Sequence, residues 1–181
     1  MNLTRKIIID TFLELCQTIP IEKVGIEFLM KKAGLSKPTF YHHFKDKYDL
    51  IAAIYIQDVT ETAKSHKYLG GVEELVIGLR NLSSKKEFYK KALSMSGQNT
   101  LHETLHQYNM NYNCQALKKY LNTDHLSDEL MYLLNYHSYG CIGYTIDWLK
   151  KDCPVSPEEL AAVEYKYMPD ILKQAWNREE G

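Results

Sequence analysis

The 181-residue chain lacks any strong excess of charge of one sign. It carries 22 Lys and Arg against 23 Asp and Glu, and its isoelectric point is near 6.7. A net charge of −1 excludes the strong overall basic field that marks many nucleic-acid-binding proteins. Residues 1–50 hold eight basic and six acidic side chains, a charge of +2, whereas the remainder carries −3. This small asymmetry only permits a DNA-binding N-terminal region.

Paired cysteines and long apolar runs are also lacking. The apolar run at residues 7–9 is interrupted at once by an acidic residue, so it does not resemble a signal peptide, and no stretch approaches a membrane span. The cysteines are far apart and form no C-x-x-C, which argues against a disulfide framework or a structural zinc site. They are Cys16, Cys114, Cys141 and Cys153. We expect a cytoplasmic protein with reduced thiols, no membrane association, and no metal or cofactor.

Alternating β-branched runs are absent as well, which argues against strands and favours an all-helical chain. Apolar residues instead recur at intervals of three and four. This spacing predicts helices over residues 3–18, 26–32, 37–43, 46 to the mid-60s, 72–82, 84–95, 98–121 and 126–151, with a last helix from Pro157. Gly34 suits a left-handed C-terminal cap, and Ser36 and Asp46 are expected N-caps.

The segment from Phe28 to Lys47 has the pattern of a short helix, a tight glycine turn and a second short helix, which is a helix-turn-helix. Phe40 and Phe44 are four residues apart and should face inward, which leaves the polar side of the second helix outside. The exposed residue types suit phosphate oxygens, guanine and the thymine methyl group. The amides at the start of the following helix offer a further phosphate site. We predict DNA contacts from Lys37, Pro38, Thr39, Tyr41, His42 and Lys47, although spacing alone leaves an ordinary helical hairpin as the alternative.

Residues 5–55 resemble the DNA-binding domain of the TetR family of transcriptional regulators. The run AGLSKPTFYHHFKDK, residues 33–47, is similar almost position for position to that family's signature, and residues 8–15 resemble its first helix. The resemblance implies an all-α fold, with an N-terminal three-helix helix-turn-helix domain and a C-terminal helical bundle. It also implies that the six residues above face DNA, with Lys47 holding a phosphate. Residues 24–26 depart from the family pattern, because they lack the threonine or serine usual near the start of its second helix.

On this resemblance we expect residues 1–46 to form the DNA-binding domain and residues 47–181 to form an effector-binding and dimerisation domain. Segments 88–99 and 148–160 resemble a C-terminal subgroup of the family that includes a dihydroxyacetone-kinase operon activator. The resemblance implies a ligand-responsive repressor that binds a palindromic double-stranded DNA operator as a homodimer and takes an unknown small-molecule effector. Activation of transcription stays open, as does a helical dimer that binds a partner without reading DNA.

The stretch HETLH at residues 102–106 has the H-E-x-x-H pattern of zinc hydrolases. At this spacing His102 and His106 share a helix face, and Glu103 is placed to deprotonate a metal-bound water. A protease needs a third ligand, and no companion motif stands near Asp128 and Glu129. We therefore interpret HETLH as an ordinary polar or partly buried helix face and the protein as no enzyme, with a zinc-dependent hydrolase as the alternative.

Fourteen tyrosines are present, and several concentrate in the two long helices expected over residues 98–121 and 126–151. Such tyrosines either line an effector pocket or pack in a core or a dimer interface. The candidate effector residues are His102, His106, Tyr108, Tyr112, Tyr136 and Tyr139. Small residues in the second of these helices and apolar positions in the last helix suit either a four-helix dimer interface or packing within one chain, and the resemblance to the family implies the dimer. The candidate interface residues are Gly140, Gly143, Tyr144, Leu160, Val163, Tyr167 and Ile171.

Overall fold

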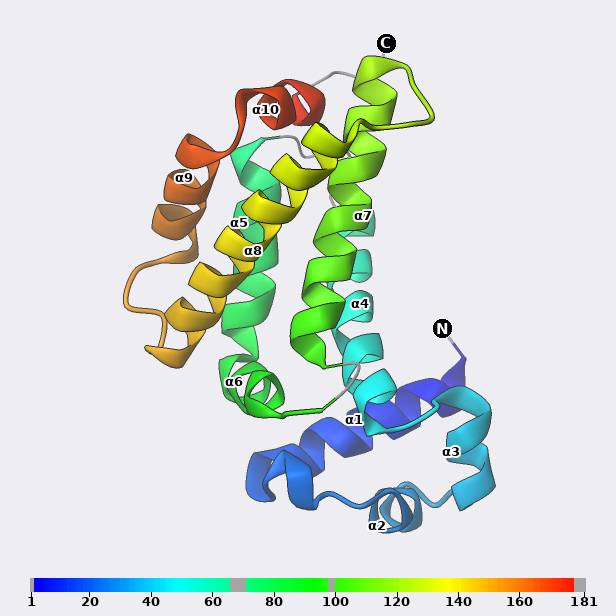
Figure 1. The fold of residues 1–181 in the computed structure, drawn as a ribbon. Helices are drawn as coiled ribbons and strands as arrows, with labels where there is room; N and C mark the ends of the chain where they lie inside the picture. Colours follow the sequence, from blue (N-terminus) through cyan, green and yellow to red (C-terminus); the bar gives the residue numbers. More distant parts are fainter. Residues whose placement is uncertain (1, 66–70, 98–99, 178–181) are drawn as a thin grey trace. The chain divides into compact units, whose positions relative to one another are not determined.

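The computed structural model describes residues 2–65, 71–97 and 100–177 (Figure 1). Every regular element within these ranges is helical, which confirms the all-α prediction. No helix in the described ranges is both long enough and apolar enough to cross a membrane. In chain order the elements are α1 (Leu3–Thr18), the 3-10 helix η1 (Ile21–Lys23), α2 (Ile26–Lys32), α3 (Lys37–His43), α4 (Lys47–Ser65), α5 (Val72–Ser84), α6 (Lys86–Ser94), α7 (Leu101–Leu121), α8 (Asp128–Lys150), α9 (Pro157–Tyr167) and α10 (Asp170–Trp176).

The predicted helix caps are present at the helix-turn-helix. Ser36 Oγ accepts a hydrogen bond from the Thr39 amide at 3.3 Å, and Asp46 Oδ1 accepts one from the Asp49 amide at 2.8 Å. Each bond satisfies an amide that has no partner within its helix, so each fixes where its helix begins. Gly34 has a φ of 67°, the left-handed conformation that favours glycine after a helix.

The prediction of one last helix from Pro157 is wrong. The chain forms α9 as far as Tyr167 and then starts α10 at Asp170. Pro169 lies between them and has no amide hydrogen to continue the helical ladder, and its ring would clash with the preceding turn. The break lets Met168 and Leu172 both turn into the core.

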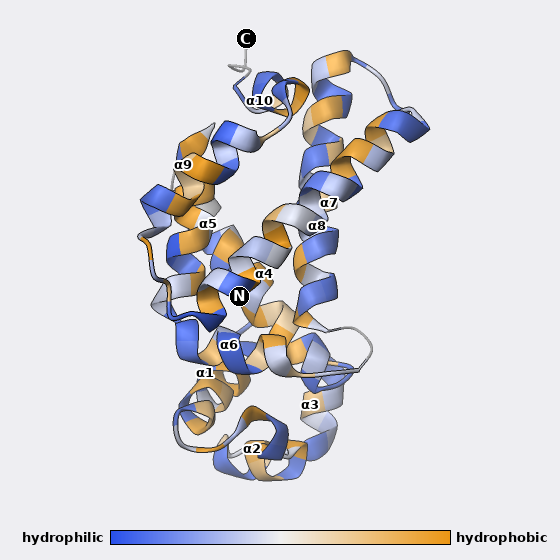
Figure 2. Cartoon of the chain, turned by 60° about the vertical axis from the view of Figure 1, so that its left-hand side comes forward, coloured by the Kyte–Doolittle hydropathy of each residue, from blue (hydrophilic) through white to orange (hydrophobic). Residues whose placement is uncertain are grey.

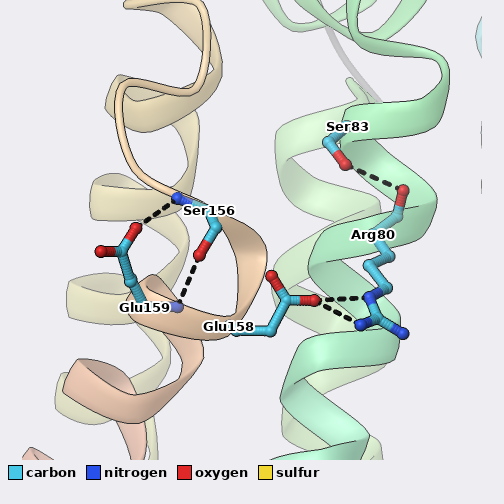
Figure 3. Close-up of polar contacts among 5 residues, drawn as sticks. All are labelled: Arg80, Ser83, Ser156, Glu158 and Glu159. Carbon is cyan, nitrogen blue, oxygen red and sulfur yellow. Dashed lines mark hydrogen bonds and ion pairs between the residues drawn. The ribbon is translucent and has the colours of Figure 1, made fainter.

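The start of α9 is fixed by its own cap, and it also carries an ion pair to α5 (Figure 3). Ser156 and Glu159 form a capping box, in which each side chain accepts a hydrogen bond from the other's amide, at 3.1 and 2.8 Å. Arg80 of α5 donates to Glu158 Oε1 at 2.6 Å. Both partners of this ion pair are largely exposed, so it contributes little to stability.

The packing divides the chain into two compact units. Unit 1 comprises residues 1–58 and 87–101, and unit 2 comprises residues 59–86 and 102–181. The first half of α4 and nearly all of α6 therefore pack with the N-terminal helices. The domain boundary expected after residue 46 concerns which segment binds DNA, and it stays a prediction.

Unit 1 is built around the buried face of α1. Ile8, Ile9 and Phe12 are almost completely buried, whereas Ile7 lies at the surface. Phe12 meets Phe88 of α6 edge to face, with ring centroids 6.3 Å apart. These contacts fix α6 to the same core that supports the helix-turn-helix.

In unit 2, α5 packs along α9 and also contacts α8. A core cluster of unit 2 is formed by residues of α7, α8 and α10 and by the residue that follows α9. Its buried members are Met110 and Leu117 of α7, Leu134 of α8, Met168, and Leu172 of α10. The helices carry hydrophobic and hydrophilic residues along their length, as amphipathic helices do (Figure 2).

Candidate nucleic-acid interface

The helix-turn-helix is formed by α2, a tight turn and α3. The Leu35 amide donates to Met30 O at 2.9 Å across the turn, and the Gly34 amide donates to Lys31 O at 3.3 Å. These bonds satisfy carbonyls at the end of α2 that have no partner within the helix. The turn therefore has a defined shape and sets the direction in which α3 begins.

One side of α3 is anchored and the other is free. Phe40 is fully buried and Phe44, just after the helix, is nearly so, as their spacing predicts. Lys37, Pro38 and His42 are exposed, and Tyr41 exposes 52% of its surface while its ring packs edge-on against Phe40. Four of the five predicted α3 contacts thus face solvent on a helix held rigidly from behind.

Thr39 is placed differently from its neighbours. It is half-buried, and its hydroxyl lies 2.7 Å from Ser36 Oγ. The threonine hydroxyl is therefore engaged in the cap of α3, and its methyl group is the part left for a thymine methyl. The predicted contact of Thr39 with DNA stays a prediction, limited to that apolar edge.

The ammonium group of Lys47 points into the chain. Its Nζ donates to Ile21 O at 2.9 Å, to Glu22 O at 2.9 Å and to Val24 O at 3.3 Å. An ammonium has three hydrogens, so this arrangement occupies every donor of Lys47. Burial lowers the pKa of Lys47, and the nearby Glu22 carboxylate partly offsets that effect. The phosphate contact predicted for Lys47 has no donor available in this conformation.

The start of α4 is also filled by the chain's own groups. Asp46 caps the helix, and Asp49 Oδ2 accepts a hydrogen bond from the Lys45 amide at 2.9 Å. Two carboxylates therefore stand in the place where the sequence predicts a phosphate, and they repel one. At the start of α2, Gly25 is the N-cap and makes no side-chain hydrogen bond, as expected from the missing threonine or serine.

Two basic residues that support the helix-turn-helix and α1 were not predicted from the sequence, and both are far from their partners along the chain. Arg5 of α1 lies over the Phe44 ring at 4.7 Å and donates to His43 O at 3.5 Å, so it braces the end of α3. Lys91 of α6 donates to Cys16 O at 3.1 Å in the last turn of α1. No local pattern could have identified either contact, because the partners are 38 and 75 residues apart.

HETLH lies in the first turns of α7. His106 Nδ1 is 2.9 Å from the buried Ser138 Oγ of α8, and its ring stacks on Tyr139 with centroids 4.1 Å apart. His102 is half-buried and Glu103 is exposed. Within the described residues, no group of three His, Cys, Asp or Glu side chains could hold a metal ion. His106 thus packs against α8, as the ordinary interpretation of this stretch expects.

The other candidate effector residues fall in separate places. Tyr112 donates its hydroxyl to Glu74 Oε2 of α5 at 2.5 Å. Burial raises the pKa of Glu74, and both burial and the Glu74 charge raise the pKa of Tyr108. Tyr136 instead exposes 75% of its surface on α8. The structure thus groups Tyr108 and Tyr112 around one carboxyl and separates them from Tyr136.

A groove of about 810 Å³ runs between α8 and α9. Gly140, Tyr144, Leu160, Val163 and Tyr167 line it, so five of the seven predicted dimer-interface residues come together. The wall also includes the exposed Tyr132 and Tyr136 together with Leu133 and Pro169.

The remaining two predicted interface residues lie elsewhere. Gly143 is exposed on α8 but does not line the groove. Ile171 packs against the core cluster of its own chain. For Ile171 the cause is the break at Pro169, which gives α10 a course of its own instead of extending α9.

The floor of the groove carries three titratable side chains. Glu164 Oε1 accepts a hydrogen bond from Thr145 Oγ1 at 3.0 Å. Burial raises the pKa of Glu164 to about 7, and the Thr145 hydroxyl partly offsets this. Burial likewise raises the pKa of Cys141 to about 12 and lowers the pKa of His137. All three groups are therefore driven toward their neutral forms, as in an apolar contact surface.

These features together define a helix-turn-helix protein with a separate helical C-terminal part. The family profile described as "Bacterial regulatory proteins, tetR family" matches residues 8–54. The profile described as "Transcriptional regulator C-terminal region" matches residues 78–170, which is more than half of the chain. The chain belongs to the TetR family of transcriptional regulators, as its sequence signature indicates.

One curated relative aligns with about half of this chain. The HTH-type dhaKLM operon transcriptional activator DhaS of Lactococcus lactis subsp. lactis (strain IL1403) is 30% identical over 90 residues, 49% of this chain and 48% of that protein. The alignment thus spans about half the length of this curated relative.

Two solved structures show the same fold. That of the dihydroxyacetone kinase operon activator DhaS has a TM-score of 0.67 at 22% identity, covering 94% of this chain and 97% of the other. That of the fatty acid degradation regulator FadR from Bacillus halodurans has a TM-score of 0.55 at 15% identity, covering 95% and 96%. At these identities the likeness shows the fold alone.

Proposed function

We propose that the protein is an effector-responsive regulator that binds a palindromic DNA operator as a homodimer. The observation that carries the proposal is the placement of α3. Phe40 and Phe44 anchor this helix from behind, while Lys37, Pro38 and Tyr41 project from its other side. A rigid helix with an exposed cation and exposed hydrogen-bonding groups is what readout of a major groove requires.

The second copy of the chain is the proposed occupant of the α8–α9 groove. Four tyrosines on α8 (Tyr132, Tyr136, Tyr139 and Tyr144) each expose more than half of their surface, a density that suits a contact surface. Burial shifts the pKa values of Glu164, Cys141 and His137 toward their neutral forms, so covering the floor leaves less charge to desolvate. Two copies related by a twofold axis would present two α3 helices to the two halves of a palindrome.

We propose that the effector acts at the group formed by Glu74, Tyr108 and Tyr112. A half-buried carboxyl bonded to the Tyr112 hydroxyl, with Tyr108 close enough to feel its charge, offers both acceptors and donors to a ligand rich in hydroxyl or amine groups. Binding would shift the population between two arrangements of the dimer that differ in operator affinity. Glu74→Gln should weaken the response to an effector while leaving operator affinity without effector unchanged.

The sign of regulation has two candidates. Resemblance to the family implies repression, and the activity in the name of the relative DhaS favours activation. A reporter gene behind the operator separates the two, because deletion of a repressor raises expression and deletion of an activator lowers it.

Selection from a random double-stranded DNA library tests the DNA-binding proposal directly. We expect recovery of a palindrome that binds with strong salt dependence, because phosphate contacts release counterions. Lys37→Ala/Tyr41→Ala should reduce binding at least about tenfold, and Lys150→Ala, an exposed lysine of α8, should not. Enrichment of no sequence, or equal binding by the double variant, would contradict the proposal.

Analytical ultracentrifugation tests the dimer. Tyr136→Glu/Tyr144→Glu places charges on the groove and should convert the dimer to a monomer. The control is Lys118→Glu on an exposed position of α7, which should leave the dimer intact. If the tyrosine variant stays dimeric, the second copy binds elsewhere.

A further inference from the structure

Two lysines hold the segment Cys16–Val24, which we name the α1–α2 corner. This segment contains the last turn of α1, the 3-10 helix η1 and the residue after it. Gly25 follows it directly as the N-cap of α2, and α2 packs against both α1 and α3. The position of the corner therefore sets the position of α2, and through α2 that of the DNA-reading helix.

Lys47 holds the corner from α4. Its ammonium lies within 3.3 Å of three carbonyl oxygens, two in η1 and one on Val24, 23 to 26 residues earlier in the chain. Hydrogen bonds from a charged donor are about twice as strong as neutral ones. The carbonyls at the end of a short helix have no helical partner, so loss of the ammonium would remove the donor from three acceptors at once, two of which, Ile21 O and Val24 O, are partly buried.

Lys91 holds the corner from α6. Its ammonium donates to Cys16 O at 3.1 Å. The last turn of α1 contains no basic residue of its own, so Lys91 supplies the positive charge that the carbonyl end of a helix favours. Lys47 and Lys91 also both lower the pKa of the buried Cys16 thiol against the effect of burial, which places the two ammonium groups around the same residue.

We propose that Lys47 and Lys91 are positioning residues that fix the α1–α2 corner to α4 and α6, and that Lys47 affects operator binding through this corner instead of through a phosphate. The proposal deepens the proposed function and rests on it for the operator. It departs from the role that resemblance to the family implies for Lys47. A shift of α4 or α6 would move the corner with it, because each helix holds carbonyls of the corner by a charged group.

Three variants separate positioning from phosphate contact. Lys47→Met removes the ammonium, and Lys45→Met removes an exposed charge two residues away as its control. Lys47→Arg keeps the charge and suits a phosphate at least as well as lysine does. A planar guanidinium cannot direct its donors from one nitrogen to three convergent carbonyls, so it should not restore the corner.

The measurements are operator and random-DNA affinities across a series of salt concentrations. Positioning predicts that Lys47→Met and Lys47→Arg both lose about tenfold in operator affinity at every salt concentration. The slope of log affinity against log salt should stay as in Lys45→Met, and the ratio of operator to random-DNA binding should fall. A loss of folded protein alone would leave that ratio unchanged. A direct phosphate contact predicts a slope smaller by about 1.8 per dimer in Lys47→Met and full binding by Lys47→Arg.

Amide hydrogen exchange of residues 17–30 supplies a readout that needs no DNA. Exchange should accelerate in Lys47→Met and in Lys91→Met, but not in Lys45→Met or Lys37→Met. Unchanged exchange together with the reduced salt slope would overturn the proposal. If the wild-type protein binds no operator, the proposed function fails, and the exchange experiment still decides whether the two lysines hold the corner.

Discussion

The protonation of Glu164 should make the stability of unit 2 depend on pH. Its carboxyl lies in the floor of the α8–α9 groove, bonded to Thr145 Oγ1. Burial raises its pKa from an ordinary value of 4.5 to about 7. The folded chain therefore binds this proton more tightly than the unfolded chain does. The stability that Glu164 contributes is fully present below about pH 4.5 and is lost as the pH rises to 7.

The size of the effect follows from the shift. About 2.5 pKa units at 1.36 kcal/mol each amount to about 3 kcal/mol of unfolding free energy. Glu164→Gln removes the titration but keeps the shape and an oxygen that can accept from Thr145. At pH 5 the two proteins should differ by about 1 kcal/mol or less. At pH 8 the variant should be more stable by about 3 kcal/mol.

Urea unfolding at pH 5 to 8, followed by tryptophan fluorescence, measures this difference. Both tryptophans, Trp148 and Trp176, lie in unit 2 together with Glu164. Protein concentration must be fixed, because dimerisation adds to apparent stability. Asp147→Asn, at an exposed position of α8, is the control and should follow the wild-type pH profile. Parallel profiles for wild type and Glu164→Gln would refute the reasoning.

Three smaller predictions concern helix ends and one surface ion pair. Ser156→Ala should lower the unfolding free energy of unit 2 by about 1 kcal/mol in urea, since it removes half of a capping box; an unchanged midpoint would contradict this. Arg80→Ala should leave the same urea midpoint unchanged, because its ion pair with Glu158 is exposed. Gly34→Ala should cost about 1 kcal/mol in a thermal melt followed by circular dichroism. The cost comes from the positive φ and not from a clash, because a Cβ added at Gly34 would meet no atom within 4 Å. An unchanged melting temperature in Gly34→Ala would contradict this prediction.

The helix-turn-helix could be predicted from sequence because its determinants are local. The spacing of Phe40 and Phe44 identified the buried side of α3, and Ser36 and Gly34 marked its start and the turn before it. Each of these signals acts within four residues. The exposed face of α3 then followed from helix geometry alone.

The role of Lys47 could not be predicted in the same way. Its partners are backbone carbonyls, which carry no signature in the sequence, and they lie 23 to 26 residues away. A lysine at the start of a helix looks the same in sequence whether its ammonium binds a phosphate or the backbone of its own chain. The position of Ile171 could not be predicted for a related reason: the expected helix ran on through Pro169, whereas Ile171 lies on α10 and packs against the core cluster.

The HETLH stretch shows how the spacing of a metal motif also makes a packing face. Residues four apart on a helix share one side, and that side of α7 lies against α8. On this side His106 Nδ1 forms a hydrogen bond with Ser138 Oγ, and the imidazole ring stacks on Tyr139. The two contacts together hold the imidazole ring in place. A zinc ion needs three or four ligands near 2 Å from one point. In the described part of the chain no group of three His, Cys, Asp or Glu side chains could hold a metal ion. His106 packs against α8 by the same helix geometry that suggested a metal.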